Sequence, residues 1–221
     1  MSTLTGRYVS SPESQFSRDL RMIEEKGFTR LLEEVEASRL SDSFWETTLV
    51  SDLESSSVTN PAYIVYLASQ LYDGDASLLA EGTKVDFLID NVTGDRHHVF
   101  PKEYLRKNGY ANNQRNQVAN YAYIGKKDNI TISDKSPKEY FGIVLDQCRS
   151  KSPVIGDITS EEGLRANMRV NCIPEMTIGA EAPDYEEFLD LRRALMAEKI
   201  HAYYLKLKSR CRSDLAQSAI S

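Results

Sequence analysis

Apolar residues recur at helical spacing along most of this chain, and the one long interruption of that rhythm lies between residues 94 and 132. Stripes of this kind run through residues 12–26, 28–37, 60–75 and 182–210. We interpret residues such as Phe16, Leu20, Ile64 and Leu71 as core-facing positions of amphipathic helices. The pattern therefore predicts a mainly helical protein.

Short alternating segments replace the helical stripes within the interruption. His98-Val99-Phe100 is typical of a short strand ended by Pro101, and NYAYIG, from Asn120 to Gly125, alternates like a second strand. A helix is expected to begin directly afterwards, at Lys126. We therefore predict an α+β fold, mainly α, in which a ββα unit is embedded in a helical domain.

Three regions follow from this division. We expect a helical region over residues 1–93, the ββα unit with its following helix over 94–148, and a C-terminal helical region over 149–221 that packs on the rest. With 221 residues, 41% of them hydrophobic, the chain is long and apolar enough to bury a sizeable core.

The chain carries no sign of export or of a membrane partner. It has no apolar run of membrane-spanning length, and its N-terminus, MSTLTGRYVSSPESQF, lacks the apolar stretch of a secretory signal. We therefore expect a cytoplasmic protein. Its three cysteines form no Cys-x-x-Cys pair, which argues against a zinc knuckle.

Charge is distributed unevenly. The net charge is −6, yet residues 96–138 hold nine Lys/Arg and three acids, so this window carries +6 and the rest −12. A local basic face can bind phosphates despite an acidic body, because salt limits how far the acidic charge reaches. An ordinary solvated surface would give the same pattern.

The basic window also contains two of the three histidines, His97 and His98. Asn120 follows His98 by 22 residues, and Asn129 follows Asn120 by nine. Imidazole can take a proton from water near neutral pH, and a divalent cation can supply the positive charge that phosphodiester hydrolysis needs. Asn129 offers a hard oxygen ligand, and Asn120 can bridge the two strands and orient the base.

This spacing by itself is also compatible with an unremarkable surface loop. The third histidine, His201, lies on the predicted last helix without a nearby ligand partner, and we interpret it as structural or solvated.

A resemblance to a known family adds weight to the site. The segments HHVFPKEYLRKNGY and NQVANYAYIGKKDNITISDKSPKEYF resemble the HNH (His-Me finger) part of GmrSD-type modification-dependent restriction endonucleases. More distantly, they resemble the HNH domain of the RNA-guided CRISPR nuclease. The segments TGRYVSSPESQFSRDL, SFWETTL, NPAYIVYLASQ and RRALMAEKIHAYY extend the resemblance over most of the chain.

The resemblance implies a role for each site residue. His98 matches the general base, Asn120 the residue that positions it, and His97 and Asn129 the ligands of one divalent metal ion. His97 stands where many members have Asp, which favours Mn, Ni or Zn relative to Mg and leaves the ion's identity open. DNA backbone contacts are expected from the basic residues of the window, namely Arg96, Lys102, Arg106, Lys107, Lys126, Lys127 and Lys135.

Members of this family usually carry an N-terminal ParB-like nucleotide-handling domain, which this sequence does not show. The resemblance leaves a fragment, a split gene or a separately encoded subunit as alternatives, with a ParB-like domain or subunit as a possible partner. Three functions remain open from sequence: a DNA endonuclease of a restriction or phage-defence system, a non-catalytic DNA- or partner-binding remnant, and an unrelated helical scaffold.

Overall fold

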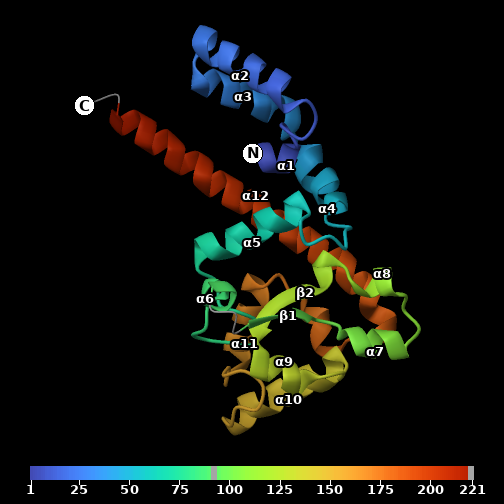
Figure 1. The fold of residues 1–221 in the computed structure, drawn as a ribbon. Helices are drawn as coiled ribbons and strands as arrows, with labels where there is room; N and C mark the ends of the chain where they lie inside the picture. Colours follow the sequence, from blue (N-terminus) through green and yellow to red (C-terminus); the bar gives the residue numbers. More distant parts are fainter. Residues whose placement is uncertain (91–93, 219–221) are drawn as a thin grey trace.

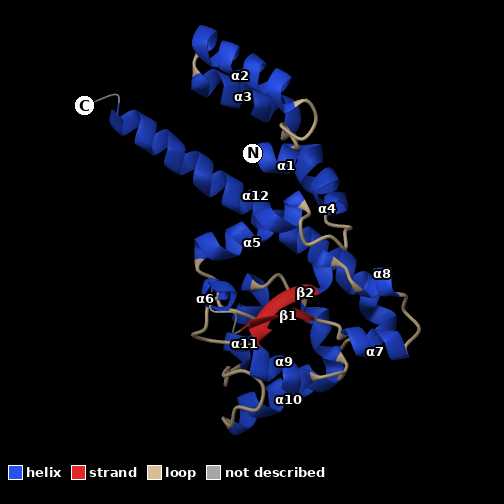
Figure 2. Cartoon of the chain, viewed as in Figure 1, coloured by secondary structure: helices blue, strands red, loops and turns tan. Residues whose placement is uncertain are grey.

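The computed structural model of the chain describes residues 1–90 and 94–218, with side chains up to residue 210. It consists of helices arranged around one small sheet (Figure 2), which confirms an α+β, mainly α, fold. Residues 91–93, which end the first predicted region, and residues 219–221, which end the third, lie outside the described residues.

The elements follow one another in three groups (Figure 1). The first group contains α1 (Ser2–Thr5), α2 (Pro12–Lys26), α3 (Phe28–Arg39), a π-helical turn (Phe44–Thr48) that continues into α4 (Leu49–Asp52), α5 (Pro61–Asp73) and α6 (Val85–Asp90). The second contains β1 (Gly94–His98), α7 (Lys102–Lys107), α8 (Asn112–Arg115), a 3-10 turn (Val118–Asn120), β2 (Tyr121–Gly125), α9 (Lys126–Ile132) and α10 (Pro137–Ser150). The third contains α11 (Glu161–Val170), two 3-10 turns (Glu175–Gly179 and Ala182–Asp184) and α12 (Tyr185–Ser218).

The two strands form an antiparallel hairpin in which Gly94 pairs with Gly125 and His98 with Tyr121. Helix α9 starts directly after β2 and packs against both strands. Glycine is needed at position 94, because a Cβ there would lie 2.6 Å from the Cβ of Leu88 on α6. The hairpin is thereby held closely between α6 and α9.

The first strand ends earlier than predicted. We expected a strand over His98-Val99-Phe100, but β1 ends at His98. The Val99 amide still donates to the Asn120 carbonyl at 2.8 Å, whereas the next amide, that of Phe100, donates to the Asn120 side chain at 2.8 Å. The ladder stops because this side chain replaces the backbone partner. Val99 and Phe100 are apolar because they are buried in the core.

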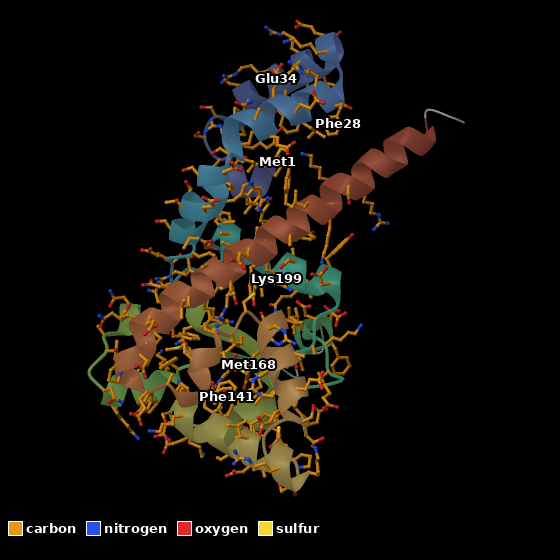
Figure 3. The ribbon with its side chains drawn as sticks, turned by 180° about the vertical axis from the view of Figure 1, so that it is seen from behind. Met1, Phe28, Glu34, Phe141, Met168 and Lys199 are labelled. Carbon is orange, nitrogen blue, oxygen red and sulfur yellow. The ribbon has the colours of Figure 1, made fainter. Side chains whose placement is uncertain are left out.

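The long helix α12 contacts elements from all three groups. It crosses the molecule behind the hairpin and packs against α4, α5 and the turn before β2 (Figures 1 and 3). One buried apolar cluster extends from Leu4 to Ile200 and draws on all three predicted regions. In the described part of the chain, no helix is both long and apolar enough to cross a lipid bilayer.

Four positions that we predicted to be core are largely exposed. Phe16 is 54% exposed, Leu20 58%, Ile64 44% and Leu71 42%. Phe16 and Leu20 lie on α2, which packs chiefly on α3. This helical pair stands apart from the sheet in Figure 1, so little of the chain is available to cover the apolar stripe of α2. Apolar periodicity predicted the helices correctly but could not tell which stripes find a partner.

A buried carboxylate connects α1 to the α2–α3 hairpin. Asp19 accepts hydrogen bonds from Arg7 (2.8 and 2.5 Å), Tyr8 (2.7 Å) and Gln15 (2.8 Å). The Arg7 guanidinium chiefly holds the pKa of Asp19 at about 2.

Because this pKa is depressed, the stabilisation is complete above about pH 4 and is lost as pH falls towards 2. We expect Asp19→Asn to weaken hydrogen-exchange protection of α2 amides at neutral pH by about tenfold, or about 1–2 kcal/mol. The variant should also lack the acid-dependent loss of protection seen in the parent. Equal protection in the two proteins would contradict this prediction.

Candidate active site around the two histidines

Adjacent side chains on β1 point to opposite sides of the hairpin, and this separates the two histidines. His97 faces α9, where its Nδ1 lies 2.7 Å from the Oδ1 of Asn129. His98, the last residue of the strand, faces the segment that precedes β2. The structure therefore brings His97 together with Asn129, as the predicted metal site requires, and places His98 in a separate environment.

His97 is held as a neutral imidazole. Its side chain is only 2% exposed, and burial lowers its pKa to about 4. Its Nε2 is buried and has no hydrogen-bond partner among the described residues, while its ring edge meets the Tyr140 ring at a centroid distance of 6.1 Å. Because an amide oxygen can only accept, Nδ1 carries the proton in the bond to Asn129 and the buried Nε2 is the unprotonated nitrogen. A metal ion at Nδ1 would have to displace that proton.

Asp95 fixes the orientation of the Asn129 carboxamide. The Asn129 amide nitrogen donates to the Asp95 carboxylate at 3.0 Å, which leaves the amide oxygen directed at His97. We did not predict Asp95 as a site residue. The signal was present in the sequence, because residues two apart on a strand share a face, so Asp95 must lie on the same side as His97.

These groups can accommodate a divalent cation. Two ligands that each bind an ion at about 2.1 Å lie roughly 3 Å apart, close to the separation of His97 Nδ1 and Asn129 Oδ1. The nearby Asp95 carboxylate adds negative charge on the far side of Asn129. Within the side chains that the structure describes, residues 1–90 and 94–210, no three His, Cys, Asp or Glu gather as a metal site, so the donor set would be one imidazole and one amide oxygen, completed by water or substrate.

His98 is partly exposed and has a well-defined environment. Its Nε2 lies 3.0 Å from the Oδ1 of Asn116, and its ring meets the Tyr121 ring edge-on at 4.9 Å. Burial lowers the pKa of His98, and the charges of Lys102, Arg96 and Arg115 act in the same direction. The imidazole is therefore neutral at pH 7, available to accept a proton, and surrounded by cations suited to a phosphate.

Asn120 acts on the backbone around His98 instead of on its ring. The Asn120 side chain is fully buried, accepts from the Phe100 amide and donates to the carbonyls of Phe100 (3.0 Å) and Arg115 (3.2 Å). It thus ties the segment after β1 to the segment before β2, which is the bridging we predicted for it. Contact with the imidazole itself comes from Asn116 and Tyr121, neither of which we predicted.

The seven basic residues predicted to contact DNA fall into two groups. Arg106 pairs with Glu103, Lys107 pairs with Asp134, and Lys135 donates to the carbonyl of Thr131. The other four are exposed, and in the described part of the chain none of them forms an ion pair: Arg96, Lys102, Lys126 and Lys127. Arg96 additionally lies over the Tyr121 ring at 5.0 Å.

A buried arginine supports the site from behind. Arg192 of α12 is fully buried and donates to the carbonyls of Ala119 (2.9 Å), Tyr121 (2.7 Å) and Asn171 (3.3 Å). The first two carbonyls flank Asn120. Sequence reasoning missed this role, because an arginine in a predicted helix carries no local sign of burial.

Comparison with known proteins gives limited information. No protein-family model and no solved structure matches the chain. The chain is 25% identical over 226 residues to the uncharacterized protein MJ0686 of Methanocaldococcus jannaschii, an alignment that covers 90% of this chain and 35% of that protein. The chain therefore spans about a third of the length of this relative, whose name assigns it no activity.

Proposed function

We propose that this chain is a metal-dependent DNA endonuclease of the HNH (His-Me finger) type, acting in the cytoplasm in a restriction or phage-defence system. The observation that carries the proposal is the 2.7 Å contact between His97 Nδ1, on strand β1 of the hairpin, and Asn129 Oδ1, on the following helix α9. The two residues are 32 apart in the sequence, both have side chains that can bind a metal ion, and they lie at hydrogen-bond distance. A partly exposed histidine follows directly on the same strand.

In this proposal His97 and Asn129 hold one divalent cation, which supplies positive charge at the scissile phosphate and at the leaving oxygen. Its identity among Mg, Mn, Ni and Zn stays open. His98 takes the proton of the attacking water, and Asn120 keeps the backbone beside it in place. Exposed Arg96, Lys102, Lys126 and Lys127 bind the DNA backbone, which gives affinity without sequence choice.

Recognition of a particular DNA would then depend on another part of the system. A ParB-like domain or subunit is the partner that the family resemblance suggests. The relative's greater length is compatible with such an addition, since this chain spans only 35% of it.

Two observations favour a second candidate, a non-catalytic DNA- or partner-binding remnant of such a protein. His97 is only 2% exposed, so its bond to Asn129 could be purely structural. His98 lies on the other side of the hairpin from His97 and Asn129, so the proposed base and the proposed metal ligands face different sides of the strand. In that case the chain would bind DNA or a partner without cleaving it.

Plasmid cleavage separates the two candidates. We expect supercoiled plasmid to be nicked or linearised in the presence of at least one of Mg, Mn, Ni and Zn, and to stay intact in EDTA. The double variant His97→Ala/Asn129→Ala should be inactive with every cation and should bind the active cation at least tenfold more weakly by calorimetry. DNA binding without cleavage under all these conditions would favour the remnant.

The basic residues allow a separate test of the DNA surface. We expect Lys126→Ala/Lys127→Ala to reduce the slope of log affinity against log salt by about 2, because each lost phosphate contact removes about 0.9. Arg106→Ala/Lys107→Ala is the matched control, since both side chains already have acidic partners, and it should change the slope less. Equal slopes for the parent and Lys126→Ala/Lys127→Ala would place the DNA elsewhere.

A further inference from the structure

The two ring nitrogens of His98 have different surroundings. Nε2 lies 3.0 Å from the Oδ1 of Asn116, whereas Nδ1 has no hydrogen-bond partner among the described residues. A neutral imidazole carries one proton, and which nitrogen bears it decides which lone pair can accept another. The identity of the atom opposite Nε2 therefore determines how the ring can react.

The orientation of the Asn116 carboxamide is determined by a backbone group. Its amide nitrogen donates to the main-chain carbonyl of Asn112 at 3.0 Å and to the Asn112 side-chain oxygen at 3.0 Å. A main-chain carbonyl can only accept, so the amide nitrogen must face Asn112. The amide oxygen of Asn116 then necessarily faces His98.

An oxygen acceptor opposite Nε2 requires the proton on Nε2. We propose that Asn116 is a positioning residue that holds His98 in the Nε2–H tautomer and so leaves Nδ1 as the nitrogen that accepts a proton. This inference rests on the proposed nuclease function. Asn116 has no role in the nuclease function as proposed above.

The step that this arrangement serves balances as an ordinary hydrolysis. The proton of the attacking water passes to His98 Nδ1 as the water oxygen forms a new P–O bond. The P–O bond to the leaving oxygen breaks, and that oxygen is protonated by solvent. The Nε2–H bond to Asn116 persists throughout and stabilises the imidazolium that forms, as a hydrogen-bonded partner does for a general base.

Three variants test the role of Asn116. Asn116→Leu removes the acceptor at similar volume, and we expect it to lower kcat for plasmid cleavage by about 10–100-fold with KM little changed, the usual scale for a group that orients another. Asn116→Asp keeps an oxygen opposite Nε2, so the Nε2–H tautomer should persist. Its second oxygen cannot donate to Asn112 as the amide does, so the tautomer and not kcat is the readout for this variant. Asn113→Leu, at an exposed position on α8, the short helix that ends just before Asn116, should have no effect.

A readout independent of activity is the tautomer itself, observed in long-range proton–nitrogen spectra of the histidine ring in the metal-free protein at pH 8. We expect His98 to show an unprotonated Nδ1 and a protonated Nε2 in the parent and in Asn116→Asp, and a mixture of tautomers in Asn116→Leu. An unprotonated Nε2 in the parent, or an Asn116→Leu variant with parental tautomer and kcat, would overturn the inference. If Asn116→Leu does not fold, the tautomer of the parent and of Asn116→Asp decides.

Failure of the inference is distinguishable from failure of the proposed function. A parent that cleaves DNA but shows the other tautomer contradicts only the role of Asn116. A parent that shows the expected tautomer but cleaves nothing contradicts the nuclease, and the catalytic meaning of Asn116 falls with it.

Discussion

Replacing His98 with alanine is expected to lower kcat for plasmid cleavage by about 10²–10⁴-fold, the range typical for loss of a general base. The His98 imidazole is a proton acceptor close enough to Lys102, Arg96 and Arg115 for their charges to act on it. Its pKa is lowered by burial, so the ring is unprotonated at pH 7 and ready to act. The variant should show little activity at any metal concentration.

The same variant should leave binding intact. His98 is not bonded to Asn129 or Asp95, so cation affinity measured by calorimetry should match the parent within about twofold. DNA affinity should also persist, because phosphate contacts come from the basic residues. Loss of kcat with cation and DNA binding preserved is the pattern that separates a general base from a structural histidine.

His201→Ala is the matched control. This histidine, interpreted from the sequence as structural or solvated, stacks on Trp45 at a centroid distance of 4.2 Å, and its loss should leave kcat unchanged. Cleavage by His98→Ala at the parental rate would remove His98 from the mechanism. Equal losses in His98→Ala and His201→Ala would point to a general effect on folding.

The candidate site shows what local sequence can and cannot predict. The pairing of His97 with Asn129 was expected from the family resemblance, and it falls in short regular elements, a strand and the first turns of the next helix. Asp95 could have been included, because residues two apart on a strand share a face. Asn116 could not, since it lies in an irregular segment whose path is set by distant contacts such as that of the Tyr185 hydroxyl with the Gln114 carbonyl (2.9 Å).

Segments without regular structure were also misjudged away from the site. The composition of residues 150–158, rich in Ser, Pro and Gly, is typical of a linker, yet Ile155 and Ile158 are buried. The Gln147 side chain donates to the carbonyls of both residues (2.9 and 2.8 Å) and so compensates for burying an irregular backbone. Composition predicted the absence of a helix but not the packing of the loop.

The largest effect on stability is expected from substitution of Arg192, whose charged guanidinium is fully buried in the interior. Its three carbonyl acceptors belong to Ala119, Tyr121 and Asn171, and no acidic side chain pairs with it in the described part of the chain. Removal of the guanidinium takes the donor from the Ala119 and Tyr121 carbonyls, at about 1–3 kcal/mol each, partly offset because a buried charge is also removed. The Asn171 carbonyl keeps the Tyr66 hydroxyl as a donor at 3.1 Å.

We therefore expect Arg192→Met, which keeps much of the volume, to lower the free energy of unfolding by about 2–4 kcal/mol. Urea unfolding followed by the fluorescence of Trp45, the only tryptophan, measures this directly. Arg149→Met is the matched control, because Arg149 is exposed and pairs only with exposed Asp146, and its effect should stay below about 0.5 kcal/mol.

The position of the lost bonds predicts more than a lower stability. Two of the three carbonyls flank Asn120, which connects the chain on both sides of His98, so amides of the 118–121 segment should lose more hydrogen-exchange protection than those of α10. An Arg192→Met variant as stable as the parent would show that the guanidinium does not support the hairpin. A uniform loss of protection over the whole chain would show that α12 stabilises the fold generally, without a particular role at the segment that carries Asn120.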